Sequence, residues 1–307
     1  MFVAVVAVAS VVPVSLLVSM VRRVATRTLL DGRTMRTVVA GSGDPLVVFE
    51  GGIAVCASMW MTVQWLVAEE TRTFAYDRAG CGGSADDPKG RFLQRMADDL
   101  AAVLDAADEG APLVLVGASL GAPILHLFAR ARLGRVAGVV MVDAAVGDIL
   151  RAPQIRVIKT MFRVFSALSR VGLHTPLRRA RLRPVTAALP VADQAQLMWD
   201  FCAKRTVQMG AQEARELTQL PSLRRLMIDL SEVPVVALVG AQAGRGETKG
   251  RAAMLNLFRS EIEPHSRGRF VTAAGSGHFI PWQEPGLVAE EIIRLVRTVR
   301  QSSANQD

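Results

Sequence analysis

The chain has 307 residues, of which half are hydrophobic and about one fifth are charged. A chain of this size can bury a large core, which favours one globular domain with an insertion over a disordered chain or a repeat array. The formal net charge of +8 comes mainly from arginine, but the arginines are not interleaved with aromatic residues in a nucleic-acid-binding motif, so we expect no nucleic acid partner.

The first predicted element is an apolar segment that has no charged residue from Phe2 to Met20 and is followed by Arg22 and Arg23. About 20 apolar residues are enough for a helix to cross a bilayer, so residues 2–20 predict a membrane anchor within an N-terminal segment 1–28. A cleaved signal peptide or a buried leader is the alternative. Because the arginines follow the segment, the positive-inside rule predicts a membrane-anchored protein whose main domain is cytoplasmic.

The next part of the chain alternates short β-branched runs with longer amphipathic stretches, which is typical of an α/β fold with a mostly parallel central sheet flanked by helices. Strands are predicted at 45–49, 73–76, 113–116, 136–142, 233–239 and 269–272. Helices are predicted at 60–69, 92–107, 121–131 and 285–299. These elements divide the chain into a core of residues 29–147 and 230–300 and a polar tail of residues 301–307.

Residues 148–229 interrupt this alternation, because they contain no convincing strand, show helical apolar spacing and are punctuated by Pro176, Pro184, Pro190 and Pro221. We interpret them as a helical lid inserted into the α/β core. Such a lid is expected to cover the carboxyl ends of the strands, where open α/β sheets bind their ligands.

The lid contains a short basic stretch made of Arg178, Arg179, Arg181 and Arg183. An ordinary solvated helix face is the simpler interpretation, and attraction to an anionic membrane leaflet is the other.

The three cysteines, Cys56, Cys81 and Cys202, are odd in number and lack the spacing of metal ligands. They predict free thiols in a reducing compartment and no metal site.

The strongest chemical signal is the apolar run 113–116 that leads into Gly117-Ala118-Ser119-Leu120-Gly121 and then into a predicted helix. A serine held on a sharp strand-to-helix turn needs small neighbours, because its backbone is strained and other chains approach closely. Gly117 and Gly121 supply this space, so Ser119 is the predicted nucleophile. Chance occurrence of glycine and serine in a loop is the alternative.

A serine needs a base to remove its proton, and the chain has four histidines. His278 lies in a glycine-flanked loop between the last predicted strand and the last helix, from which an imidazole can reach the nucleophile. His126 falls inside the helix after Ser119, His174 in the lid and His265 in a polar loop. We therefore predict His278 as the base.

The order Gly-x-Ser-x-Gly, then Ser276-Gly277-His278, with Tyr76-Asp77-Arg78 upstream, resembles the α/β-hydrolase superfamily, in particular its bacterial single-domain esterase-like members. The resemblance covers residues 33–299. It implies an oxyanion hole formed by the backbone N–H of Leu120 and of Ile53, which follows Gly51-Gly52. The chain departs from relatives at Ala118 and at Gly51, where histidine is frequent. We assign Tyr76-Asp77-Arg78 no chemistry of its own.

The acid that completes the triad is less clearly marked. In most relatives it follows the seventh strand, but residues 240–247 contain only Glu247 as a carboxylate. Asp143 ends the strand after the nucleophile helix, a position that some lipases and dehalogenases of the superfamily use. We favour Asp143, and Glu247 remains the alternative.

The sequence thus predicts a serine hydrolase that cleaves an apolar carboxylic ester through an acyl-enzyme, without metal or organic cofactor. A membrane-tethered binding or sensor protein, a serine-dependent lyase and a cofactor-free peroxidase are the alternatives, because a fold does not fix a reaction. The sequence makes no prediction of oligomeric state.

Overall fold

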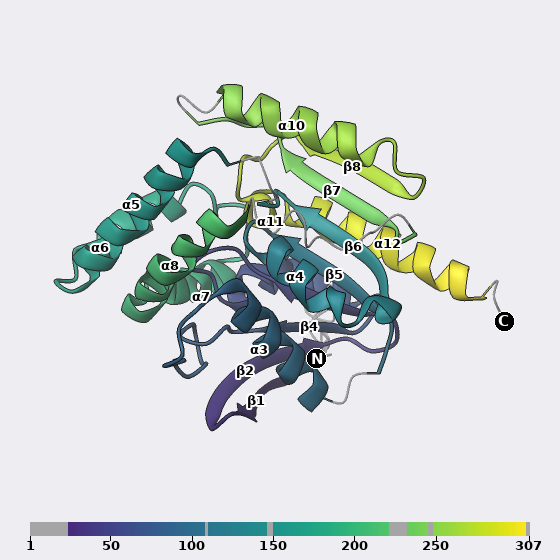
Figure 1. Cartoon of the computed structure of the whole chain (residues 1–307), viewed down its shortest axis with the longest axis horizontal. Coiled ribbons are helices and arrows are strands. Elements are labelled where there is room, and N and C mark those ends of the chain that lie inside the picture. The colour runs from purple at the N-terminus through teal and green to yellow at the C-terminus, as the bar shows by residue number, and fades with distance from the viewer. Residues whose placement is uncertain (1–23, 108–109, 146–149, 221–231, 245–247, 305–307) are drawn as a thin grey trace, which may run out of the picture.

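The computed structural model describes residues 24–304 except 108–109, 146–149, 221–231 and 245–247 (Figure 1). It contains an eight-stranded sheet in the order β1-β2-β4-β3-β5-β6-β7-β8. The strands are β1 (Val24–Leu30), β2 (Arg33–Ala40), β3 (Leu46–Glu50), β4 (Thr73–Tyr76), β5 (Leu113–Ala118), β6 (Val136–Val142), β7 (Val235–Gly240) and β8 (Gly268–Ala273).

Strands β3 to β8 pair in parallel, and all six of the predicted strands are present. The predicted mostly parallel sheet with flanking helices is therefore confirmed. Strand β5 lies between β3 and β6 and is buried at every position, which explains why it reads as a continuous apolar run.

The sequence did not predict the antiparallel hairpin β1–β2 at the edge of the sheet. Strand β2 pairs antiparallel with β4, so the hairpin extends the sheet beyond its parallel part. The predicted segment boundary at residue 28 falls inside β1, and the sheet therefore begins before the predicted core. The predicted anchor, residues 2–20, lies outside the described residues. Among the residues that are described, no helix is both long and apolar enough to span a bilayer.

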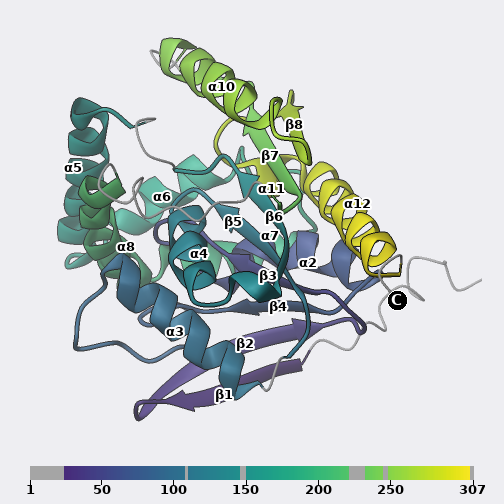
Figure 2. The ribbon, with the colours of Figure 1, turned by 45° about the vertical axis from the view of Figure 1, so that its right-hand side comes forward.

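Helices cover both faces of the sheet (Figure 2). On one face α3 (Leu93–Ala106), α4 (Gly121–Arg130) and α10 (Thr248–Ile262) share one apolar core with the strands. On the other face α2 (Met61–Ala68) and α12 (Pro285–Ala304) share a second core. The 3-10 helix η2 (Ala57–Trp60) precedes α2, η3 (Leu133–Arg135) precedes β6, and α11 (Ile280–Gln283) precedes α12.

The predicted lid is helical, as expected, and consists of α5 (Ala152–Ser169), α6 (His174–Leu182), α7 (Val191–Cys202) and α8 (Lys204–Glu216), followed by η5 (Leu217–Gln219). Helix α5 packs mainly against α8. The lid packs on the turn after β3. Gly210 of α8 lies so close to Ala54 in this turn that any side chain at position 210 would clash with the Cβ of Ala54.

The prediction of three free thiols was wrong for two of them. Cys56 and Cys81 form a disulfide between the turn after β3 and the turn after β4, and only Cys202 is a free cysteine among the described residues. The two cysteines are 25 positions apart in the chain, and the pairing of β3 with β4 brings them together. The argument from cysteine usage for a reducing compartment therefore no longer holds.

Candidate active site

Ser119 lies on a sharp turn between β5 and α4 and has a positive φ of 50°. A non-glycine residue rarely adopts this conformation, which has to be stabilised by its surroundings. Its two glycine neighbours permit the turn: a Cβ on Gly121 would lie 2.3 Å from the carbonyl oxygen of Glu50, and a Cβ on Gly117 would lie 2.9 Å from the backbone of Ala122. Close approach of neighbouring backbone thus explains both glycines.

Asp143 occupies the corresponding position on the neighbouring strand. Ala118 and Val142 are paired in the parallel register of β5 and β6, so Ser119 and Asp143 both follow directly after their strands. Asp143 also has a positive φ, of 43°. The backbone N–H of Ser119 donates to the carbonyl oxygen of Val142, which ties the two turns together.

His278 contacts Asp143 directly, with 2.6 Å between its Nδ1 and the Asp143 Oδ2. The carboxylate is buried at 2% exposure, whereas the imidazole is 46% exposed. The loop that carries His278 is packed closely against the end of β7, because a Cβ on Gly240 would lie 2.0 Å from the carbonyl oxygen of Gly277. The structure therefore brings together the predicted base and the favoured acid.

The other oxygen of Asp143 accepts two further hydrogen bonds, from Nη1 of Arg251 at 2.5 Å and from the backbone N–H of Gly240 at 3.1 Å. Burial works against the charged carboxylate, but the contacts with His278, Arg251 and Gly240 outweigh it and lower the pKa of Asp143. The carboxylate is therefore held ionised beside the imidazole. The sequence analysis missed Arg251 and its helix α10; Glu247, the alternative acid, lies outside the described residues.

The glycine turn after β3 lies against the serine. A Cβ on Gly52 would lie 3.2 Å from the Cβ of Ser119. The two predicted oxyanion donors, the backbone N–H groups of Ile53 and Leu120, donate to no other residue in the described part of the chain. Donors without an internal partner at such a turn suit a developing negative charge on a substrate oxygen.

Arg78 stabilises this turn through hydrogen bonds to its backbone. Its guanidinium donates to the carbonyl oxygens of Gly51 and Gly52, at 2.9 and 2.5 Å, and to Oε1 of Glu50, at 2.5 Å. Tyr76 donates its hydroxyl to the other oxygen of Glu50. The sequence analysis gave Tyr76-Asp77-Arg78 no chemistry, and the structure shows that two of these residues support the glycine turn.

The same guanidinium reaches the lid. Nε of Arg78 donates to Oε1 of Glu213 at 2.8 Å, and the second oxygen of Glu213 accepts the backbone N–H of Ala54 at 3.0 Å. Arg91 also donates to Glu213. Burial alone would favour a neutral Glu213, but Arg78 and Arg91 lower its pKa, so a charged network joins α8 to the glycine turn.

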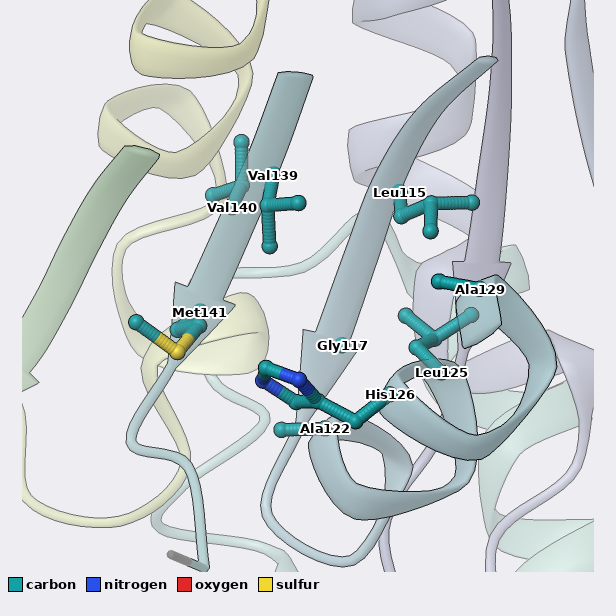
Figure 3. Close-up of a pocket in the computed structure, with 9 residues that line it drawn as sticks. All are labelled: Leu115, Gly117, Ala122, Leu125, His126, Ala129, Val139, Val140 and Met141. Atoms are coloured by element: carbon teal, nitrogen blue, oxygen red, sulfur yellow. The ribbon is translucent and has the colours of Figure 1, made fainter. Parts of the chain in front are cut away.

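The other histidines lie away from this arrangement. His126 of α4 is buried beside a cavity of about 10 Å³ lined by Leu115, Val139 and Met141 (Figure 3). A space of this size corresponds to about one water molecule, so the cavity is too small for a substrate. Neither ring nitrogen of His126 has a partner among the described residues, and burial lowers its pKa to about 4.

A cluster with the composition of a metal site occurs at Cys56, Asp77 and Cys81, whose ligand atoms lie within 4.8 Å of one another. The two sulfur atoms are joined in the disulfide, so they offer no thiolate to a metal ion. Asp77 instead accepts the backbone N–H of Ala57 and the guanidinium of Arg36.

Comparison with known proteins shows the family to which the chain belongs. A model of the family described as "Alpha/beta hydrolase family" matches residues 7–291. Among curated proteins, the uncharacterized protein YqjL of Bacillus subtilis is 33% identical over 108 residues, which cover 35% of this chain and 43% of YqjL. The chain thus matches less than half the length of this relative.

Solved structures of similar fold include a thermophilic esterase from Thermogutta terrifontis, at 23% identity and a TM-score of 0.66, covering 91% of this chain and 99% of that one. The Cif epoxide hydrolase from Acinetobacter nosocomialis is 14% identical with a TM-score of 0.70, and the match covers 89% of both chains. At these identities the likeness shows the fold alone.

Proposed function

Because this chain belongs to the alpha/beta hydrolase family, we propose that it is a serine hydrolase of carboxylic esters in which Ser119 is the nucleophile, His278 the base and Asp143 the acid. The observation that supports this most directly is the 2.6 Å contact between His278 and Asp143. Asp143 directly follows β6, the strand that pairs with β5, and β5 leads into the turn that carries Ser119. A hydrogen bond to Nδ1 leaves Nε2 as the nitrogen that takes up the serine proton.

In the proposed reaction, Oγ of Ser119 attacks the ester carbonyl carbon while its proton passes to His278. The N–H groups of Ile53 and Leu120 stabilise the oxyanion. His278 then returns the proton to the leaving alcohol, which leaves an acyl group on Ser119. A water molecule, activated by His278, attacks this acyl group and releases the carboxylic acid.

Apolar side chains from the lid and from the glycine turn support an apolar ester as the substrate. Phe162 of α5 and Ala214 of α8 pack with Ala54, and Ile53 lies against the same cluster. This apolar cluster lies directly beside the glycine turn, and small-molecule sites are typically lined by apolar side chains with a few placed polar groups. We propose a small-molecule ester with an apolar acyl or alcohol group.

A carboxylate nucleophile, which epoxide hydrolases and haloalkane dehalogenases of this fold use, does not fit a chain with serine at position 119. The remaining alternatives keep the serine: a binding or sensor protein without turnover, a lyase, or a cofactor-free peroxidase. The test below separates a hydrolase from all three.

The test uses a series of nitrophenyl esters of increasing acyl length and a fluorophosphonate probe. We expect turnover and covalent labelling, both lost in Ser119→Ala and both kept in Ser260→Ala, which removes an exposed hydroxyl on α10. A folded protein that is neither labelled nor active would support the binding protein. Labelling without ester turnover would support the lyase or the peroxidase.

We further propose that residues 2–20 anchor the protein in a membrane. The support is the apolar composition of this segment. The arginines after this segment favour the cytoplasmic side for the hydrolase domain, whereas the Cys56–Cys81 disulfide favours an oxidising compartment. Carbonate extraction of membranes should leave the full chain in the pellet and release a variant that lacks residues 2–20. Extraction of the full chain would exclude the anchor.

A further inference from the structure

The positive charge of this chain is concentrated in the first half of the lid. Residues 151–192 contain nine of the 36 Lys and Arg residues and none of the 28 Asp and Glu residues. The net charge of the whole chain is +8, so the rest of the chain is close to neutral. A one-sided distribution of this kind creates a local field that attracts anions.

Helix α5 combines this charge with exposed apolar side chains. Val157 and Val164 are seven residues apart and therefore share one face of the helix, with exposures of 68% and 51%. Val171, in the turn after the helix, is 70% exposed. An arginine precedes each valine, at positions 156, 163 and 170, and all three arginines are exposed. We call these six residues the valine–arginine row.

These arginines have no acidic partners. Arg156, Arg163 and Arg170 form no ion pair with any carboxylate in the described part of the chain. On the exposed side of α12, by contrast, Arg294, Arg297 and Arg300 each pair with a glutamate. Exposed valines that alternate with arginines free of acidic partners are typical of helices that lie on membranes.

Helix α6 also combines arginines with exposed apolar side chains. Its surface has a hollow of about 320 Å³ between Thr175, Pro176, Arg179, Ala180 and Arg183. Leu173 and Leu177 beside it are more than half exposed. Two guanidinium groups and a hydroxyl at one hollow suit a phosphate head group. Arg178 is different, because it is buried with its guanidinium 3.6 Å from the ring of Phe201 and fixes α6 on α7.

The valine–arginine row faces away from the sheet. The opposite side of α5 buries Ile155 and Phe162, and α5 packs mainly on α8. Both views of the ribbon place α5 at the outer edge of the molecule (Figures 1 and 2). Nothing in the described part of the chain therefore covers this row.

We propose that the outer surface of α5 and α6 docks on an anionic lipid bilayer, with the valines entering the head-group region and the arginines binding lipid phosphates. This docking depends neither on ester hydrolysis nor on residues 2–20. It would bring the lid to the membrane surface.

The test places an environment-sensitive dye on the full chain at Val164→Cys, in a Cys202→Ser background, and a second dye at Gly134→Cys as the control. Gly134 is exposed in η3, directly before β6, and lies at the opposite end of that strand from the lid. Vesicles of phosphatidylcholine alone are compared with vesicles containing about one third phosphatidylglycerol. We expect a blue shift at position 164 on anionic vesicles alone, lost in 1 M NaCl, and none at position 134.

The double variant Arg156→Gln/Arg163→Gln should raise the anionic lipid concentration needed for half of the shift at least tenfold, because each arginine near the surface contributes about fivefold. The double variant Arg130→Gln/Arg259→Gln removes the same charge from exposed positions outside the lid and should have little effect. Repeating both in Ser119→Ala separates docking from catalysis.

Three results would overturn the proposal. The first is equal dye spectra on neutral and anionic vesicles, and the second is an equal effect of the two double variants. The third is a shift produced by soluble glycerol phosphate at the same phosphate concentration, which would make the hollow on α6 a site for small anions.

Discussion

Arg78 and Glu213 form a fully buried ion pair between the turn after β4 and the lid helix α8, with 2.8 Å between Nε and Oε1. The same arginine binds the carbonyl oxygens of Gly51 and Gly52, beside the proposed oxyanion donor. The position of the lid and the geometry of the glycine turn are therefore coupled through one guanidinium.

Replacing Arg78 should affect both stability and catalysis. Arg78→Met leaves Glu50 and Glu213 without their main partner, which is expected to cost about 3–5 kcal/mol of unfolding free energy in urea titrations. In Arg78→Lys one ammonium cannot serve all of these acceptors, so we expect kcat to fall on the order of 100-fold, as when an oxyanion donor is lost. A folded Arg78→Lys protein with unchanged kcat would exclude a role for this network in catalysis.

Asp143→Asn should slow ester hydrolysis by roughly 10⁴-fold, because the imidazole then loses the group that fixes its tautomer and stabilises its charge. Glu247→Gln is the matched control and should leave the rate nearly unchanged. The measurement is kcat/KM with a nitrophenyl ester. If the two variants behave in the opposite way, the acid has been assigned to the wrong residue.

His126 should make the protein sensitive to acid. Its pKa is near 6.5 in the unfolded chain and is lowered by burial to about 4 in the fold. As the pH falls from 6.5 to 4, the unfolded chain binds a proton that the folded one excludes, so stability is lost in this window and is constant above it.

At pH 4.5 this loss amounts to about 2–3 kcal/mol. His126→Leu should therefore lose less stability than the unsubstituted chain between pH 7.5 and pH 4.5, by about this amount, in urea titrations at the two pH values. His265→Gln controls for the removal of a histidine elsewhere. Equal pH dependence of His126→Leu and the unsubstituted chain would refute this account.

Two glycine variants test the packing around Ser119. A Cβ on Gly121 would overlap the backbone of Glu50, whereas a Cβ on Gly134 would meet nothing within 4 Å. We expect Gly121→Ala to lower the melting temperature clearly and to abolish activity, and Gly134→Ala to change neither. Full activity in Gly121→Ala would show that the turn tolerates displacement.

The parts of the fold that could be predicted are those whose signal is local. Strands β5 and β6 are apolar runs of the right length, and the turn at Ser119 has glycines at fixed offsets. The base was found because few histidines compete for the role. Asp143 remained one of two candidates because only the pairing of β5 with β6 places it beside the nucleophile turn.

The features that escaped prediction depend on contacts between distant segments. Strand β1 has three consecutive polar residues, Thr26, Arg27 and Thr28, between two apolar pairs, so it lacks the alternation that marks a strand in the sequence. Helix α10 buries only Phe258 and Ile262 and has a weak apolar stripe. Arg78 is an ordinary turn residue in the sequence, and its role exists only because Gly51, Gly52 and Glu213 surround it.

The Cys56–Cys81 disulfide encloses two of the chain's methionines, Met59 and Met61. Cyanogen bromide, which cuts after methionine, would therefore yield peptides 36–59 and 62–96 still joined through sulfur. Without reductant they would run as one species in mass spectrometry, and dithiothreitol would separate them. The same digest of protein taken directly from cells would report whether the compartment in which it folds is oxidising.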